Sequence, residues 1–169
     1  MNEIEFKIPP IYSFAPIADF QSKVLVLGTM PGKESLRMNA YYAHPQNAFW
    51  KILFTLFHLP FSTDNQIRRE MLLRNGIALW DVLESCTRQS SLDTDIRQEY
   101  PNDIVQFLAT HPNISVILFN GKGAAGYFRK YFPGVDLPNQ VMPSTSPAHA
   151  IRWEAKLEAW KTIINMGIK

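Results

Sequence analysis

Aliphatic runs along this chain predict a set of buried strands, and helical periodicity between the runs predicts the helices that cover them. Four runs are typical of buried strands, although the last of them is brief. They are residues 23–27, 77–80, 114–119 and 141–142. Apolar residues that recur every three or four positions predict five helices. These span residues 48–60, 62–76, 101–110, 122–132 and 153–164.

Strands that alternate with helices favour an α/β fold with a mainly parallel sheet covered on both faces. The length suits one domain with its own core, so residues 1–169 are predicted to form a single domain. Residues 1–22 are expected to be an irregular lead-in, and the polar residues 84–100 an excursion at a strand's end. Pro101 suits the first turn of a helix. The last helix is expected to bury one stripe, made of Trp153, Leu157, Trp160 and Ile164.

The connection at residues 28–50 is the segment around which a functional site is predicted. It reads GTMPGKESLRMNAYYAHPQNAFW and contains no clear helix or strand. A connection of this length is usually functional or disordered, and its aromatic residues argue against disorder. Because open α/β folds bind ligands beyond the carboxyl ends of their strands, we expect an active-site loop here. The loops after Leu27, Trp80 and Met142 should converge on that edge of the sheet.

The composition is that of an ordinary globular protein, and it excludes several kinds of site. The chain is 46% hydrophobic and 19% charged with a formal net charge of +2, so charge alone does not indicate a nucleic-acid binder. The single cysteine, Cys86, excludes an intrachain disulfide, a four-cysteine iron–sulfur cluster and a cysteine-rich zinc site. Residues 1–10 lack the apolar core of a signal peptide, and no run approaches the roughly 20 apolar residues of a membrane span. We therefore expect a cytoplasmic protein, and the working hypothesis takes it to be a monomer without a metal or cofactor.

Five sequence pieces, in this order along the chain, resemble the uracil-DNA glycosylase superfamily and in particular its hypoxanthine-DNA (deoxyinosine) glycosylase branch. They are GTMPG at 28–32, YYAHPQNAFW at 41–50, LWDV at 79–82 with SCTR at 85–88, FNG at 119–121 and MPSTSP at 142–147. The resemblance implies a three-layer α/β/α sandwich around a four-stranded, mainly parallel sheet. It also implies a metal-free, monofunctional enzyme that hydrolyses the N-glycosidic bond of a deaminated base in DNA, chiefly hypoxanthine and also xanthine. Such an enzyme must flip the nucleotide out of the duplex.

Two residues are the catalytic candidates that the resemblance implies. The amide oxygen of Asn47 could hold a water against the sugar C1′, which suffices if an oxocarbenium-like sugar needs only a weak nucleophile. From its position alone, Asn47 could equally cap the helix that follows. Asp81, after a buried strand, could accept from N1–H of hypoxanthine or act as the base for the water. Its alternative is the cap of a turn.

The first loop supplies the residues that the resemblance places around the base, which are Gly28, Thr29, Met30, Tyr42 and His44. Tyr42 matches the aromatic position that stacks on the base, although it could also brace the loop, a role that we assign to Tyr41. His44 could donate to a phosphate or base oxygen, or form a hydrogen bond within the loop. Met30 stands where uracil-specific relatives have a polar group, and a thioether cannot orient a nucleophile. Efficient uracil removal by the usual route is therefore not expected.

Contacts to the DNA backbone are assigned to Gly32 and to the loop formed by Ser144, Thr145 and Ser146. The glycine allows close approach of the backbone. The proline-framed loop, at a predicted helix start, suits phosphate binding by N–H groups and hydroxyls, or else caps the last helix. His149 is the candidate for the side chain that fills the space left by the flipped base, because Ala148 is too small.

Three other functions are compatible with the sequence. The first is a uracil or thymine mismatch glycosylase in which Asp81 activates the water. The second is a non-catalytic nucleic-acid-binding module in which Met30 marks a lost active site. The third is an enzyme of small nucleotides, although the chain has neither a Walker A nor a GxGxxG pattern.

Overall fold

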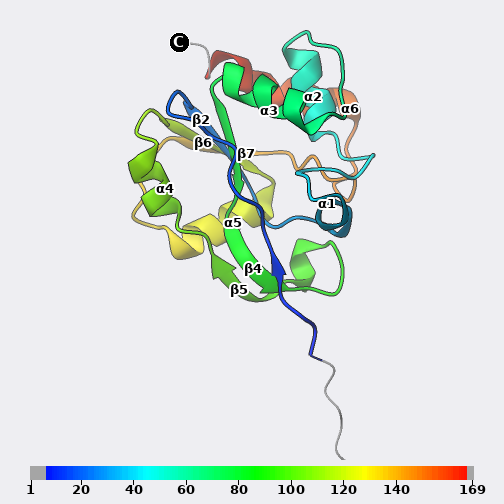
Figure 1. Cartoon of the computed structure of the whole chain (residues 1–169), viewed down its shortest axis with the longest axis vertical. Coiled ribbons are helices and arrows are strands. Elements are labelled where there is room, and N and C mark those ends of the chain that lie inside the picture. Colours follow the sequence, from blue (N-terminus) through cyan, green and yellow to red (C-terminus); the bar gives the residue numbers. More distant parts are fainter. Residues whose placement is uncertain (1–6, 167–169) are drawn as a thin grey trace, which may run out of the picture.

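The centre of the structure, a computed structural model that describes residues 7–166, is a four-stranded parallel sheet (Figure 1). Its strands are β2 (Val24–Gly28), β3 (Ile77–Asp81), β6 (Val116–Asn120) and β7 (Asn139–Met142), in the order β3-β2-β6-β7. Every residue of β2 is buried, and its unbroken aliphatic sequence is typical of a strand covered on both faces. Each of the four predicted runs overlaps one of these strands, so this part of the prediction is confirmed.

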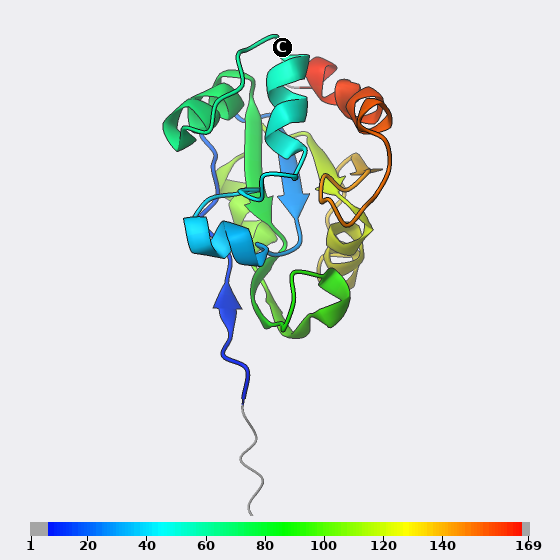
Figure 2. The ribbon, with the colours of Figure 1, turned by 90° about the vertical axis from the view of Figure 1, so that its right-hand side faces the viewer.

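Helices cover both faces of the sheet. On one face lie α2 (Phe49–Leu56), α3 (Asn65–Arg74) and α6 (Trp153–Trp160), and on the other lie α4 (Ile104–Thr110) and α5 (Lys122–Tyr131). Because successive side chains of a strand point to opposite faces, Val24 and Val26 pack with the first group, and Leu25 and Leu27 pack with the second. Figure 2 shows α2 and α6 side by side in front of the sheet. The predicted three-layer α/β/α sandwich is confirmed.

A second, antiparallel sheet was not predicted. Its strands are β1 (Ile11–Tyr12), β4 (Leu83–Thr87) and β5 (Arg97–Pro101), in the order β1-β4-β5. The expectation that residues 84–100 form only an excursion is therefore wrong. Of the lead-in over 1–22, residues 1–6 lie outside the described part, and the remainder is irregular as expected except for β1 and a bridge between Ile17 and Leu79. Pro101 ends β5 instead of starting a helix. The helix α4 begins at Ile104, and the side chain of Asp103 accepts a hydrogen bond from the Gln106 N–H at 3.0 Å.

Smaller differences concern helix ends. The connection after β2 contains a six-residue helix, α1 (Lys33–Met38), that was not predicted. The helix α2 ends at Leu56, before Pro60, and α3 begins after Asp64, whose carboxylate accepts from two N–H groups of its first turn. The last helix ends at Trp160 and continues as the 3₁₀ helix η2 (Lys161–Asn165).

The predicted stripe of the last helix is correct only in part. Trp160 is fully buried in the core, but the side chain of Trp153 is 36% exposed, because α6 begins at that residue. None of the helices in residues 7–166 is long and apolar enough to cross a membrane.

Candidate active site

The carboxyl edge of the parallel sheet brings polar residues to one level. Gly28 pairs with Asp81 in the register of β2 and β3, and Leu27 pairs with Phe119, so that Asn120 follows at the same edge. The loops beyond this edge enclose a cavity of about 650 Å³, a volume that is ordinary for a ligand site. The predicted convergence of the three loops is confirmed. All twelve predicted site residues line the cavity: Gly28, Thr29, Met30, Gly32, Tyr42, His44, Asn47, Asp81, Ser144, Thr145, Ser146 and His149.

Two buried polar atoms lie over Gly28. A Cβ atom added to this glycine would be 2.5 Å from Asp81 Oδ1 and 2.6 Å from Tyr42 Oη. Within the described part of the chain, neither Asp81 Oδ2 nor Tyr42 Oη has a hydrogen-bond partner, although both atoms are buried. Since leaving a buried polar atom without a partner costs about 1–3 kcal/mol, such atoms indicate a place that binds a polar group.

Burial also changes the proton affinity of this pair. The pKa of Asp81 is raised to about 7, mainly by burial and also by the negative charge of Asp93, while the Arg88 guanidinium opposes the rise. Burial and the charge of Asp81 raise the pKa of Tyr42 above its ordinary value. Tyr42 therefore remains a neutral hydrogen-bond donor, while Asp81 changes charge near neutral pH. A carboxylate with such a pKa is suited to accept a proton or to hold a donor of the substrate.

The two tyrosines of the first loop have different surroundings. The Tyr41 hydroxyl donates to the carbonyl of Ala15 at 2.7 Å, and the Tyr41 carbonyl accepts from the Trp50 indole at 2.8 Å. The prediction that Tyr41 braces the loop is confirmed. Tyr42 has a left-handed backbone with φ of 50°, and its ring contacts Phe49 with the ring centroids 4.3 Å apart. This conformation directs its hydroxyl over Gly28, while stacking on a base stays a prediction.

Asn47 both lines the cavity and caps a helix. Its Oδ1 accepts a hydrogen bond from the Phe49 N–H at 3.0 Å, so the side chain caps the first N–H of α2 as predicted, but the N-cap residue is Ala48 and not Asn47. A carbonyl oxygen has two lone pairs, and capping leaves one of them for a water. The two roles proposed for Asn47 are therefore compatible.

His44 lies on the exposed side of the same loop. Its Nδ1 accepts from the Gln46 N–H at 3.1 Å, which confirms the predicted hydrogen bond within the loop. In the neutral ring, the proton must then be on Nε2. His44 can therefore still donate toward the cavity mouth.

The loop after β7 is fixed from inside by an asparagine at the end of β6. Asn120 Oδ1 accepts from the Thr145 N–H at 2.9 Å, and Asn120 Nδ2 donates to Thr145 Oγ1 at the same distance. Thr145 is almost fully buried, whereas Ser144 and Ser146 are half-buried and His149 is exposed. The Thr145 hydroxyl thus serves this internal contact, whereas the two serines are more accessible, and their contact with phosphate stays a prediction.

The expectation that this loop stands at a helix start is wrong. The helix α6 begins at Trp153, six residues after Pro147, so its N-terminal N–H groups are not part of the loop. The loop is instead held by Lys156 of α6, whose Nζ donates to the Ser146 carbonyl at 3.1 Å, and by its Thr145 carbonyl, which accepts from the Ala48 N–H at 3.0 Å.

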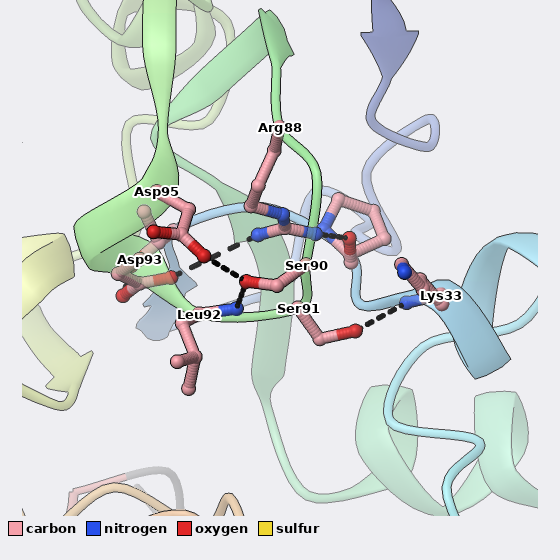
Figure 3. A network of polar contacts seen from close by, with 9 residues as sticks. Lys33, Arg88, Ser90, Ser91, Leu92, Asp93 and Asp95 are labelled. Carbon is pink, nitrogen blue, oxygen red and sulfur yellow. Dashed lines mark hydrogen bonds and ion pairs between the residues drawn. The ribbon is translucent and has the colours of Figure 1, made fainter.

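One wall of the cavity comes from a segment in which the sequence indicated no site residue. The buried Arg88 guanidinium donates to the Pro31 carbonyl and lies 3.9 Å from Asp93 Oδ1. Figure 3 shows Arg88 and Asp93 within this network of polar contacts. The other Asp93 oxygen accepts from the Thr29 hydroxyl at 2.8 Å. Ser91 Oγ accepts from the backbone N–H of Lys33 at 2.9 Å. These contacts fasten residues 88–95, including the 3₁₀ helix η1 (Asp93–Asp95), onto the first loop.

Asp93 is the functional candidate that the sequence did not reveal. It lines the cavity and raises the pKa of Asp81 by charge repulsion. Its own side chain is 44% exposed, and partial burial raises its pKa while the bond from Thr29 opposes that effect. An arginine and an aspartate five residues apart in a polar segment give no distinctive signal. Among the described residues, no cluster of histidine, cysteine, aspartate and glutamate side chains is arranged to hold a metal ion.

Replacing Gly28 by alanine is expected to lower the free energy of unfolding by about 1–3 kcal/mol, because the new Cβ would overlap Asp81 Oδ1 and Tyr42 Oη. Chemical denaturation measures this difference. Gly126→Ala is the matched control: its Cβ would meet no atom within 4 Å, and inside α5 it is expected to raise the free energy of unfolding by about 1 kcal/mol. Equal effects of the two substitutions would contradict the tight packing over Gly28.

Comparison with known proteins assigns the family. The model of a family described as the uracil DNA glycosylase superfamily matches residues 15–166. The chain belongs to the uracil DNA glycosylase superfamily. The resemblance of its five sequence pieces to this family is thereby confirmed.

Relatives within this superfamily match nearly the whole chain. A Methanosarcina barkeri protein named hypoxanthine DNA glycosylase is 32% identical over 148 residues, which are 87% of this chain and 93% of the relative. A Methanosarcina acetivorans protein of the same name is 28% identical over 151 residues, 89% of this chain and 95% of the relative. An NMR structure from Methanosarcina acetivorans, described as a proposed uracil DNA glycosylase, has a TM-score of 0.82 at 27% identity and covers 94% of this chain and 99% of its own.

Proposed function

We propose that this member of the uracil DNA glycosylase superfamily is a monofunctional DNA glycosylase that hydrolyses the N-glycosidic bond of hypoxanthine in deaminated DNA. The names of the two Methanosarcina relatives support this base. The observation that carries the proposal is the pair of buried, unpartnered polar atoms on Asp81 and Tyr42 in a cavity that also includes Asn47. Xanthine, which shares the N1–H group, is the second expected base.

Asp81 and Tyr42 are placed to read the edge of a flipped base. The Asp81 carboxylate, at the end of β3, and the buried hydroxyl of Tyr42, from the loop after α1, both lie beside Gly28 at the end of β2. An ionised Asp81 would accept from N1–H of hypoxanthine, and the Tyr42 hydroxyl would donate to a base oxygen. Adenine presents an acceptor at N1, so its lone pair would face the carboxylate. Such a mismatch leaves buried polar groups unpaired and disfavours the unmodified base.

In this proposal, Asn47 lies nearer to the sugar than Asp81 does. It lines the main cavity and also a smaller hollow outside it, so it lies at the rim that the sugar must occupy when the base is inside. Its amide oxygen would position the water against C1′ while the glycosidic bond breaks ahead of attack. An oxocarbenium-like sugar requires only such a weak nucleophile. Met30, also in the wall, adds apolar surface and no competing acceptor.

Single-turnover excision on matched duplexes that carry inosine, xanthine or uracil, followed by alkaline cleavage of abasic sites, tests this function. We expect product from inosine and xanthine, little from uracil, and no protein–DNA adduct after borohydride treatment, because the mechanism uses no amine nucleophile. Strong uracil release would show that the water is positioned from elsewhere. DNA binding without product from any base would favour the non-catalytic module.

The cellular setting is inferred from the sequence and the family alone. Base flipping and a part in base-excision repair follow from glycosylase chemistry on duplex DNA. Placement in the cytoplasm and the monomeric state remain predictions. Size-exclusion chromatography with light scattering, with and without DNA, tests the monomer.

A further inference from the structure

A second hollow of about 230 Å³ lies beside the cavity. The two share Asn47 and Pro147 in their walls, so these residues form a common rim. The smaller hollow lies between the start of α2 and the segment that leads into α6, which Figure 2 shows next to each other. A hydrogen bond at 3.0 Å from the Ala48 N–H to the Thr145 carbonyl holds the two segments together.

The walls of this hollow combine positive charge with exposed apolar surface. Lys51 and Lys156 line it, and none of its nine lining residues, all of which are described, is acidic. Lys156 is only 5% exposed and uses one of its three N–H donors on the Ser146 carbonyl. Trp153 and Ile151 present large apolar side chains that are 36% and 41% exposed. An anion in the hollow would also offset the burial that lowers the pKa of Lys156.

A binding site for one nucleotide of a single strand typically combines cationic and aromatic side chains. Lysines neutralise the phosphate, and an aromatic ring provides a face for the base or sugar. When a base occupies the main cavity, its own strand must leave across the rim at Asn47 and Pro147. The neighbouring nucleotide is one phosphodiester linkage away and therefore has to lie on this side or on the opposite side of the rim.

We propose that the second hollow is a subsite for the nucleotide next to the flipped one, with Lys51 and Lys156 on its phosphate and Trp153 against its base or sugar. The inference rests on the proposed function, because it takes the strand that enters the main cavity to be DNA. Charge complementarity and continuity with the main cavity select this occupant.

A neutral-phosphate scan tests the lysine contact. The DNA contains a deoxyinosine that a 2′-fluoro group makes resistant to hydrolysis. Each of the three phosphates on either side of it is replaced, one at a time, by a neutral methylphosphonate. Fluorescence anisotropy then gives the Kd of the protein for each duplex. At one flanking position we expect binding to the wild-type protein to weaken about eightfold at 0.1 M salt, as for loss of one phosphate contact. Lys51→Ala should weaken binding similarly, lower the salt slope by about 0.9, and abolish the effect of that methylphosphonate.

Arg74→Ala is the matched control, because it removes one exposed positive charge near the opposite edge of the sheet, just before β3. It should leave the response to every methylphosphonate as in the wild-type protein. If Lys51→Ala and the wild-type protein respond alike at all six positions, the subsite is wrong. If the phosphate effect is found but the wild-type protein excises no inosine from the unmodified duplex, only the proposed function fails.

Trp153 provides a second, independent test. Trp153→Ala should weaken binding about tenfold, as expected for loss of one aromatic contact to a nucleotide, whereas Trp153→Phe should bind nearly as well as the wild-type protein. Melting temperatures of both variants control for folding. Equal affinity of the alanine variant and the wild-type protein would remove Trp153 from the subsite.

Discussion

Replacing Asn47 by alanine is expected to lower the single-turnover rate of inosine excision by about a hundredfold to a thousandfold, as is typical for the loss of one pre-positioned polar group at a reacting centre. The alanine cannot hold a water against C1′. Apolar residues of the same cavity, such as Met30, do not replace its amide oxygen. Rates measured with enzyme in excess over a labelled inosine duplex give this difference directly.

The capping role of Asn47 requires a control, because alanine also removes the acceptor for the Phe49 N–H. Loss of such a contact costs about 1 kcal/mol of stability. Asn47→Ser offers a hydroxyl that can bond to the same N–H but ends too close to the backbone to reach the sugar. We therefore expect the serine variant to be nearly as stable as the wild-type protein and still inactive. A wild-type excision rate in the alanine variant, at an equal folded fraction, would leave Asn47 a helix cap and move the water to Asp81.

The parts of the fold that were predictable are those whose burial is visible in the sequence. The strand β2 is buried along its whole length, and its residues are accordingly apolar. The strands on its two sides, β3 and β6, are also aliphatic runs in the sequence, and each ends in a polar residue, Asp81 and Asn120. Gly28, Asp81 and Asn120 lie at one level because parallel strands that begin in register also end together. The position of the site at the carboxyl edge follows from this arrangement.

The strands of the small antiparallel sheet have no such apolar pattern in the sequence. The strand β5 has no buried residue, and β1 has only two residues, so neither gives an apolar alternation. The helix α1 is too short for periodicity, and the residue that caps its end, Asn39, has a left-handed backbone with φ of 51°. Local patterns cannot predict elements that are held mainly by partners distant in sequence.

Within the site, Asp93 is likewise a residue that local sequence patterns could not predict. Its carboxylate accepts from Thr29, 64 residues away, and a Cβ on Gly123 would lie 2.3 Å from Asp93 Oδ2. The position of this carboxylate, whose side chain is 44% exposed, thus depends on segments that are far apart in the sequence and meet only in the complete fold. Residues of the first loop could be assigned from their own sequence, but the charge that shifts the pKa of Asp81 could not.

Replacing Asp81 by asparagine is expected to make the protein more stable at neutral pH and at the same time less active. In the folded protein the pKa of Asp81 is raised to about 7, well above its ordinary value of 3.8. Between these two pH values the folded state binds the proton more tightly than the unfolded state, so the wild-type protein loses stability as the pH rises from about 4 to 7. The loss is of the order of 4 kcal/mol at most. Asparagine cannot ionise, so the variant should not show it.

Urea unfolding of the two proteins at pH 5 and pH 8 measures this difference, with Asp136→Asn as the control for an exposed carboxylate. The gain from Asp81→Asn should be larger at pH 8 than at pH 5. Excision should change in the opposite direction: if the ionised carboxylate binds N1–H, the wild-type rate rises as the pH passes about 7, and the variant is slower at pH 8 by about a hundredfold without that rise. A wild-type rate that falls through pH 7 would instead mean that the protonated acid is the active form and donates to the base. Greater stability with lower activity would identify Asp81 as a carboxylate kept buried for its reaction at a cost to the fold.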